Sequence, residues 1–189
     1  MQRKTLYFDT ETTGVDHTKH GLIQLACLID IDNNVVDEAT WFIRPFHGDL
    51  INKEASEITG YSREDMEMFP DAKQAYSEIC TFFGKHVDKY DRNDKFWPAG
   101  YNCLFDLNFL RMFFEKNDDK YFGSWQNWKG IDGLAIIRYL AWQGKIDLPD
   151  YKLGTVCEYF GIKLGDSAHD ALADIRATRE LIIKLKEIE

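Results

Sequence analysis

The sequence predicts an α/β domain in which helices flank a mixed β-sheet. Three short β-prone runs separated by turn residues come first, before Pro45. Beyond Pro70, segments with helical spacing of apolar residues alternate with one more short β-prone run. The chain has 189 residues, of which 44% are hydrophobic, and this is enough to bury a core. We therefore expect one domain over residues 1–189.

The predicted strands are short. The first covers 5–8 and ends at a polar TETTG turn, the second covers 22–31, and the third returns over 35–45 after a turn at 32–34. A fourth strand is predicted at 96–101. Apolar spacing predicts helices at 71–89, 105–116, 131–142, 153–160 and 168–188.

A polar, irregular segment between the second and third predicted helices carries several aromatic residues. They are Tyr121, Phe122, Trp125 and Trp128. Two interpretations stay open: the rings pack a long loop onto the body of the domain, or they form a base-stacking or partner surface.

Composition excludes several classes of protein. No apolar run reaches the roughly 18 residues that a membrane helix needs, and the mean hydropathy is −0.41. The N-terminal residues lack the apolar stretch of a signal peptide, so we expect a cytoplasmic protein. The four cysteines are widely spaced without a CxxC pair, which disfavours a disulfide framework and a zinc site.

The charge balance is acidic, with 23 Lys and Arg against 32 Asp and Glu and a net charge of −9. Tight electrostatic wrapping of nucleic acid is therefore disfavoured, because that affinity comes largely from basic side chains on phosphates. A site that meets phosphates through bound cations stays open, since carboxylates are the ligands of such cations.

Acidic side chains stand at the ends of several predicted elements. Asp9 and Glu11 follow the first strand, and positions i and i+2 of an extended chain point the same way, about 6.5–7 Å apart. A polar strand exit with Asp9 capping a turn would give the same pattern. Asp106 lies at a helix start, where the helix dipole alone favours it, but on the ridge of Phe109 and Phe113 a charge without a partner is costly.

The last helix adds Asp174, which falls on its inward stripe with Ala171 and Thr178. His169 stands five residues earlier, about 140° away around a helix, so the two share a site only if His169 precedes the helix proper. In that position an imidazole suits a mobile general base, and a satisfied surface histidine is the alternative.

Four carboxylates predict a hard-oxygen site for Mg²⁺ or Mn²⁺ rather than for zinc. Two such ions about 3.5–4 Å apart activate water and stabilise the leaving oxygen of a phosphodiester. The ions also offset the negative field of the chain where a phosphate must sit.

Taken together, the motifs FDTETTG, NCLFDLNFL and HDALAD resemble those of the DEDDh family of 3′–5′ exonucleases. The resemblance runs in the family's order over nearly the whole chain. The spacing of the last motif separates two branches of the family. The tyrosine branch has a Tyr four residues before the last Asp, where this chain has Asp170, and the histidine branch has a His five residues before it, where this chain has His169.

The resemblance implies a ribonuclease-H-like fold with a central mixed five-stranded sheet. It implies one metal held by Asp9, Glu11 and Asp174 and a second by Asp9 and Asp106, with His169 taking a proton from the attacking water. Products would be nucleoside 5′-monophosphates released from a 3′ end. The implied substrate contacts are Thr10, Thr12, Thr13, Gly14, Val15, Ile58, Thr59, Asn102 and Phe105.

The acidic balance favours single-stranded 3′ ends of DNA or RNA as partner, and no residue reports on a 2′-hydroxyl. We expect a free-standing nuclease rather than a replication subunit, with no membrane association. Two rivals remain. An aspartyl phosphatase would have Asp where this chain has Glu11. A nuclease-like module that binds nucleic acid or a partner without cutting would not need chemically competent residues at all five catalytic positions, which this chain has.

Overall fold

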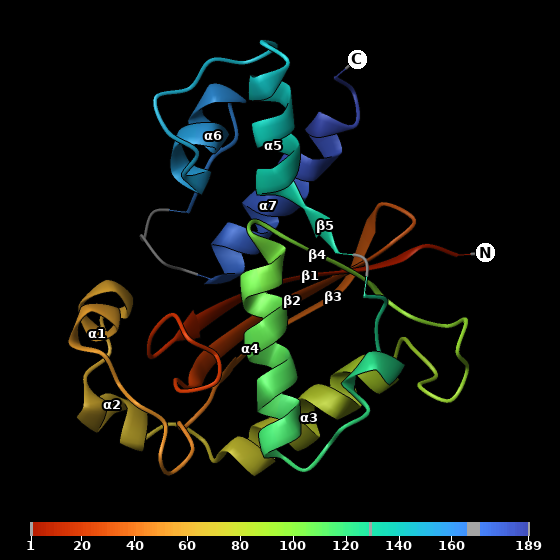
Figure 1. Cartoon of the computed structure of the whole chain (residues 1–189). Helices are drawn as coiled ribbons and strands as arrows, with labels where there is room; N and C mark the ends of the chain where they lie inside the picture. The colour runs from red at the N-terminus through yellow and green to blue at the C-terminus, as the bar shows by residue number, and fades with distance from the viewer. Residues whose placement is uncertain (1, 129, 166–170, 189) are drawn as a thin grey trace.

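The computed structural model describes residues 2–128, 130–165 and 171–188 (Figure 1). Its five-stranded sheet has the order β3-β2-β1-β4-β5. The strands are β1 (Lys4–Thr12), β2 (Leu22–Ile31), β3 (Asn34–Phe42), β4 (Trp97–Gly100) and β5 (Ile131–Asp132). β1, β2 and β3 pair antiparallel, whereas β4 pairs parallel with both β1 and β5. The predicted mixed five-stranded sheet is therefore confirmed.

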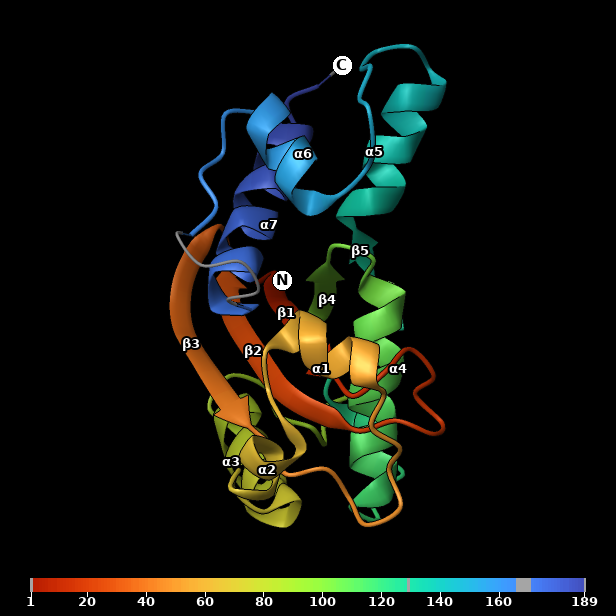
Figure 2. The same cartoon turned by 90° about the vertical axis from the view of Figure 1, so that its left-hand side faces the viewer.

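Helices cover both faces of this sheet (Figures 1 and 2). They are α1 (Lys53–Thr59), α2 (Arg63–Glu67), α3 (Ala72–Gly84), α4 (Cys103–Lys116), the 3₁₀ turn η1 (Phe122–Ser124), α5 (Gly133–Trp142), α6 (Leu153–Tyr159) and α7 (Ala171–Leu185). α3 and α4 pack on one face, whereas α7 packs on the other and carries α5 and α6 on its outer side.

The alternation of β1 explains how a central strand serves both layers. Leu6 and Phe8 belong to the core beneath α3 and α4, whereas Tyr7 joins the core beneath α7. Successive side chains of a strand point to opposite faces, so Asp9 and Glu11 continue the α7 face and Thr10 continues the α4 face.

β1 is longer than predicted, because its pairing with β2 continues through the polar residues. Asp9 lies opposite Ala26 and Glu11 opposite Gln24, so both acids are in the strand rather than in a turn after it. The antiparallel ladder supplies backbone partners that the local sequence does not reveal.

Other differences concern short or weakly patterned elements. α1 has no buried residue and thus no apolar stripe, and α2 is only five residues long, so neither was predicted. β5 has two residues and ends at Asp132, whose side chain caps α5, so the helix predicted from 131 begins at Gly133. The helix predicted over 71–89 ends at Gly84. Within the described ranges, every helix is too short or too polar to cross a membrane.

Candidate active site

The site begins where β4 stops short. β4 pairs with β1 only from Thr5 to Tyr7, which leaves the rest of that edge of β1 without a neighbouring strand. α4 starts just after β4 and brings Asp106 to this edge. The Asp106 Oδ1 atom accepts hydrogen bonds from the Thr10 backbone N–H at 3.1 Å and from the Thr10 hydroxyl at 2.7 Å. The carboxylate thus takes the place of the missing strand.

The turn between β4 and α4 is fixed by a second aspartate. Asn102 adopts a left-handed conformation with φ of 65° immediately before α4. Its backbone N–H donates to Asp132 Oδ1 at 3.0 Å, and the same oxygen accepts from Leu134 N–H at the start of α5. This bond ties the start of α4 to the start of α5 and so sets where Asp106 can reach. Asn102 itself is exposed.

The four predicted carboxylates act on one another electrostatically. Burial raises the pKa of Asp9 well above its usual range, and the charges of Asp106, Glu11 and Asp174 raise it further. Burial, followed by the charges of Asp174 and Asp106, raises the pKa of Glu11 to about 7. The fold therefore collects acids that are 165 residues apart in the chain, from Asp9 to Asp174, into one electrostatic cluster.

Asp106 is the most deeply placed of these acids, with 4% of its surface exposed. Its pKa is raised to about 7, chiefly by burial, while the two hydrogen bonds from Thr10 act in the opposite direction. The nine ion pairs found in the described part of the chain involve neither Asp9 nor Glu11 nor Asp106. In that part of the chain these acids therefore have no ion-pair partner of the kind that buried acids usually have.

The chemistry of this donor set fits hard divalent cations, because its four members offer carboxylate oxygens. Within residues 2–128, 130–165 and 171–188, no three Asp, Glu, His or Cys side chains have metal-binding geometry. The acids are close enough to shift one another's pKa, but their oxygens do not form a ready coordination cage.

The loop after β1 uses its threonine side chains within the protein. The Thr13 hydroxyl donates to the Leu50 carbonyl at 2.6 Å and accepts from the Gly21 N–H at 2.8 Å. The Thr12 hydroxyl donates to the Gly14 carbonyl at 2.8 Å. These bonds fix the loop, so a contact of this segment with substrate would have to come from its backbone.

Gly14 is held against the buried His20 ring. A Cβ at Gly14 would lie 2.3 Å from the His20 Cδ2 atom, so only glycine fits there. The Nδ1 atom of His20 lies 3.1 Å from the Asp16 backbone N–H, which further orders the loop. Sequence reasoning did not single out His20, because a lone histidine carries no distinguishing pattern.

The apolar residues predicted to contact substrate reach the surface. Val15 is 79% exposed and Ile58 is 59% exposed. Phe105 is half-buried with its ring centroid 5.0 Å from that of Phe109. The Thr59 hydroxyl is buried and has no hydrogen-bond partner among the described residues. The structure thus leaves Val15 and Ile58 accessible to a ligand, and their role stays a prediction.

The predicted general base, His169, lies outside the described residues. Asp174 lies in the first turn of α7, which in the described part of the chain begins at Ala171.

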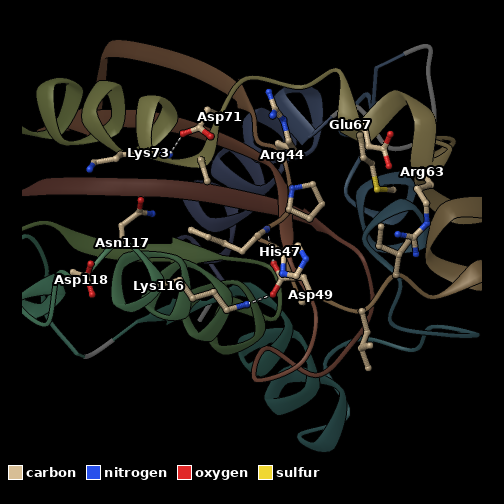
Figure 3. Close-up of a pocket in the computed structure, with 17 residues that line it drawn as sticks. Arg44, His47, Asp49, Arg63, Glu67, Asp71, Lys73, Lys116, Asn117 and Asp118 are labelled. Carbon is tan, nitrogen blue, oxygen red and sulfur yellow. Dashed lines mark hydrogen bonds and ion pairs between the residues drawn. The ribbon is translucent and has the colours of Figure 1, made fainter.

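A cavity that is lined by other residues lies elsewhere in the fold. It has a volume of about 840 Å³ and lies between the 44–51 segment, α2, the start of α3 and the end of α4 (Figure 3). The Lys116–Asp49 ion pair lines it, but none of the predicted catalytic residues does.

The sheet order and its covering helices define a ribonuclease-H-like fold, as predicted. A family model described as "Exonuclease" matches residues 6–182. The chain therefore belongs to this exonuclease family, and the predicted resemblance to the DEDDh exonucleases is confirmed, as is the predicted enzyme class at the level of the family.

Among curated proteins, the chain is similar to PolC-type DNA polymerase III. The identity is 29% over 185 residues for the Halalkalibacterium halodurans protein, covering 98% of this chain and 11% of that protein. It is 28% over 181 residues for the Thermotoga petrophila protein, covering 95% of this chain and 12% of that protein. The chain thus spans only about 11% of the length of the first of these relatives.

Solved structures of Exonuclease I share the fold. E. coli Exonuclease I in complex with a dT13 oligonucleotide has a TM-score of 0.80 at 23% identity, covering 97% of this chain and 41% of that chain. The moderately thermophilic Exonuclease I from Methylocaldum szegediense has a TM-score of 0.80 at 24% identity, covering 99% and 41%. A zinc-bound form of the E. coli ExoI–ssDNA complex has a TM-score of 0.81 at 22% identity, covering 99% and 41%.

Proposed function

We propose that this chain is a metal-dependent 3′–5′ exonuclease domain that hydrolyses phosphodiester bonds at single-stranded 3′ ends and releases nucleoside 5′-monophosphates. The observation that carries the proposal is the cluster of mutually repelling, buried and half-buried carboxylates beside the second half of β1, within a chain of the exonuclease family. Keeping anions together in a buried place costs free energy unless cations join them.

Asp9, Glu11, Asp106 and Asp174 would hold two divalent cations, Mg²⁺ or Mn²⁺. When bound, such ions lower the pKa of water and stabilise charge on the leaving oxygen. Asp9 acts as the centre of the group, because all three other acids contribute to its raised pKa. Thr10 positions Asp106 through its two hydrogen bonds.

His169 is proposed to take a proton from the attacking water. Its place five residues before Asp174 matches the histidine branch of the family. A histidine suits this task because its ordinary pKa lies near neutral pH.

The remaining predicted residues would bind the 3′-terminal nucleotide. The Thr13 N–H donates to the Gly21 carbonyl at 2.9 Å and so holds the loop in place. The neighbouring backbone of Thr12 and Gly14 would contact the terminal sugar, and the exposed Val15 and Ile58 would offer apolar contact to the base. Phe105, Thr59 and Asn102 would complete the wall of this subsite. The single-stranded preference is supported by the dT13 and dA16 complexes of the structurally similar Exonuclease I.

The test is a digestion of 5′-labelled oligonucleotides, with single-stranded DNA, duplex DNA and RNA as substrates and Mg²⁺, Mn²⁺ or EDTA present. We expect a ladder that shortens from the 3′ end with either metal and vanishes with EDTA. Asp9→Asn should remove nearly all activity, while Asp147→Asn, a change of an exposed acid, should leave it intact. Absence of digestion under every condition would refute the proposal.

A further inference from the structure

Two surface segments meet at the end of the sheet opposite the acidic cluster. Segment 88–95 leads into β4, and segment 117–128 follows α4 (Figure 1). Side chains from both line one hollow of about 340 Å³. Because β1 and β4 run parallel, the start of β4 lies beside the start of β1, at the end of the sheet away from Asp9 and Glu11. The surface, called here the basic-aromatic patch, comprises Lys89, Tyr90, Arg92, Lys120, Tyr121 and Trp128.

Acidic residues alternate with basic ones in segment 88–95, but the acids are engaged in the loop itself. Asp88 accepts a hydrogen bond from the Tyr90 backbone N–H at 3.0 Å, and Asp91 accepts one from the Asn93 N–H at 2.8 Å. Asp94 forms an ion pair with Lys4 and accepts from the Asp88 N–H. The carboxylates therefore shape the loop.

The cations of the patch are not held by acidic side chains in this way. Lys89, Arg92 and Lys120 form no ion pair with any acid in the described part of the chain. All three are exposed and line the hollow. The carboxylates of the same two segments keep the surface from being positive as a whole, so these exposed cations offer individual contacts to phosphates.

The aromatic residues divide into two groups. Phe122 and Trp125 are buried, at 2% and 4% exposure, and anchor the segment to the core. Tyr90, Tyr121 and Trp128 are exposed by 88%, 79% and 60%. The packing interpretation is therefore confirmed for Phe122 and Trp125, whereas the base-stacking or partner interpretation stays a prediction for the exposed Tyr121 and Trp128.

Cations lie next to the exposed rings. The Lys89 Nζ atom is 5.4 Å from the centre of the Tyr90 ring. The Arg111 guanidinium lies 3.9 Å from the centre of a Trp128 ring. Arg111 is on α4, five residues beyond Asp106, which is about 7.5 Å along the helix axis. α4 thus connects the acidic cluster to the patch.

Exposed rings interleaved with cations match the chemistry of a single-stranded nucleic acid, because unpaired bases stack on rings while phosphates meet the positive charges. A duplex keeps its base faces stacked inside, and an acidic peptide would use the cations without needing the rings. We propose that the basic-aromatic patch binds a single-stranded segment of the substrate away from its 3′ end. This inference rests on the proposed function and adds a second contact region to it.

The experiment measures binding of fluorescent dT4 and dT20 to the full chain in EDTA, and cleavage of the same oligonucleotides with Mn²⁺. Tyr121→Ala should weaken dT20 binding by about 5- to 100-fold, the effect of losing one stacked base. Lys120→Gln should reduce the slope of log affinity against log salt by about 0.7, the value for one phosphate contact on a single strand. The matched controls Trp142→Ala and Lys145→Gln, two exposed residues on or next to α5, should change neither quantity.

The cleavage of dT4 should stay at the wild-type rate in both patch variants, because a short substrate does not extend beyond the acidic cluster. If wild type cleaves both substrates and the variants bind dT20 as tightly as wild type does, the patch proposal is wrong and the proposed function stands. If wild type neither binds nor cleaves any oligonucleotide, the proposed function itself fails, and the patch proposal fails with it.

Discussion

Replacing Asp106 by Asn tests the cost of burying this carboxylate without using activity. In the metal-free protein, burial raises the pKa of Asp106 to about 7. The ordinary pKa of an aspartate in an unfolded chain is about 3.9. The folded state therefore binds more protons than the unfolded state between about pH 4 and pH 7. It follows that the free energy of unfolding falls as the pH rises through this window and levels off above it.

The size of the effect follows from the shift. One pKa unit corresponds to about 1.4 kcal/mol, so moving Asp106 from 3.8 to about 7 sets an upper limit of about 4 kcal/mol at pH 8. Asn removes this charge and still accepts both hydrogen bonds from Thr10, although bonds to a neutral oxygen are weaker by about 1 kcal/mol. We expect a net stabilisation of about 2 kcal/mol at pH 8, or about 4–8 °C in Tm for a chain of this size.

The assay is thermal unfolding in EDTA at pH 5 and pH 8, followed by a titration with MnCl₂. Asp106→Asn should raise Tm at pH 8 but hardly at pH 5, where Asp106 of the wild type is protonated. Manganese should raise the Tm of the wild type at pH 8 more than that of the variant, because a ligand of the folded state stabilises it. Asp147→Asn, at an exposed site, serves as the control. A variant no more stable than the wild type at pH 8 would show that burying the Asp106 carboxylate carries no such cost, and the site as described would be wrong.

Three further predictions concern single side chains. Thr10→Val removes the hydroxyl hydrogen bond to Asp106 and should raise the pKa of that acid further. The acid limb of the kcat–pH profile should then move to higher pH, and Thr10→Ser should restore it. An acid limb that does not move would exclude the positioning role of Thr10. Gly14→Ala places a methyl group against the His20 ring. It should lower the free energy of unfolding, measured by urea titration, by about 1–3 kcal/mol. Adding His20→Ala to the same chain should partly reverse this loss. His169→Ala should lower kcat by about 10²–10⁴-fold while manganese affinity persists, and wild-type turnover would move the base elsewhere.

The sequence predicted the acids of the site better than the backbone that carries them. Asp9, Glu11 and Asp106 stood out because a charge beside apolar positions needs a reason, and the structure places all three in one cluster. The extent of β1 could not be predicted, because its polar half is held by pairing with β2, a contact with residues more than ten positions away. Local composition carries no trace of such a partner.

Elements without an apolar stripe could not be predicted either, because they too lack a local sequence pattern. α1 buries none of its residues, so no periodic pattern marks it. β5 is two residues long and merges with the cap of α5 at Asp132. The fold also brings Lys89 and Lys120 to one hollow from segments that are separate in sequence, and composition alone could not show this.

The early end of β4 leaves room beside β1 for the side chain of Asp106. An extra pair of residues in β4 would let the ladder continue along β1 and occupy the Thr10 amide that now holds Asp106. Lengthening this strand, ordinarily a conservative way to strengthen a sheet, would thus expel a side chain that the proposed chemistry requires. Designs that aim to stabilise this domain should leave the interruption in place and strengthen the outer strand β3 instead.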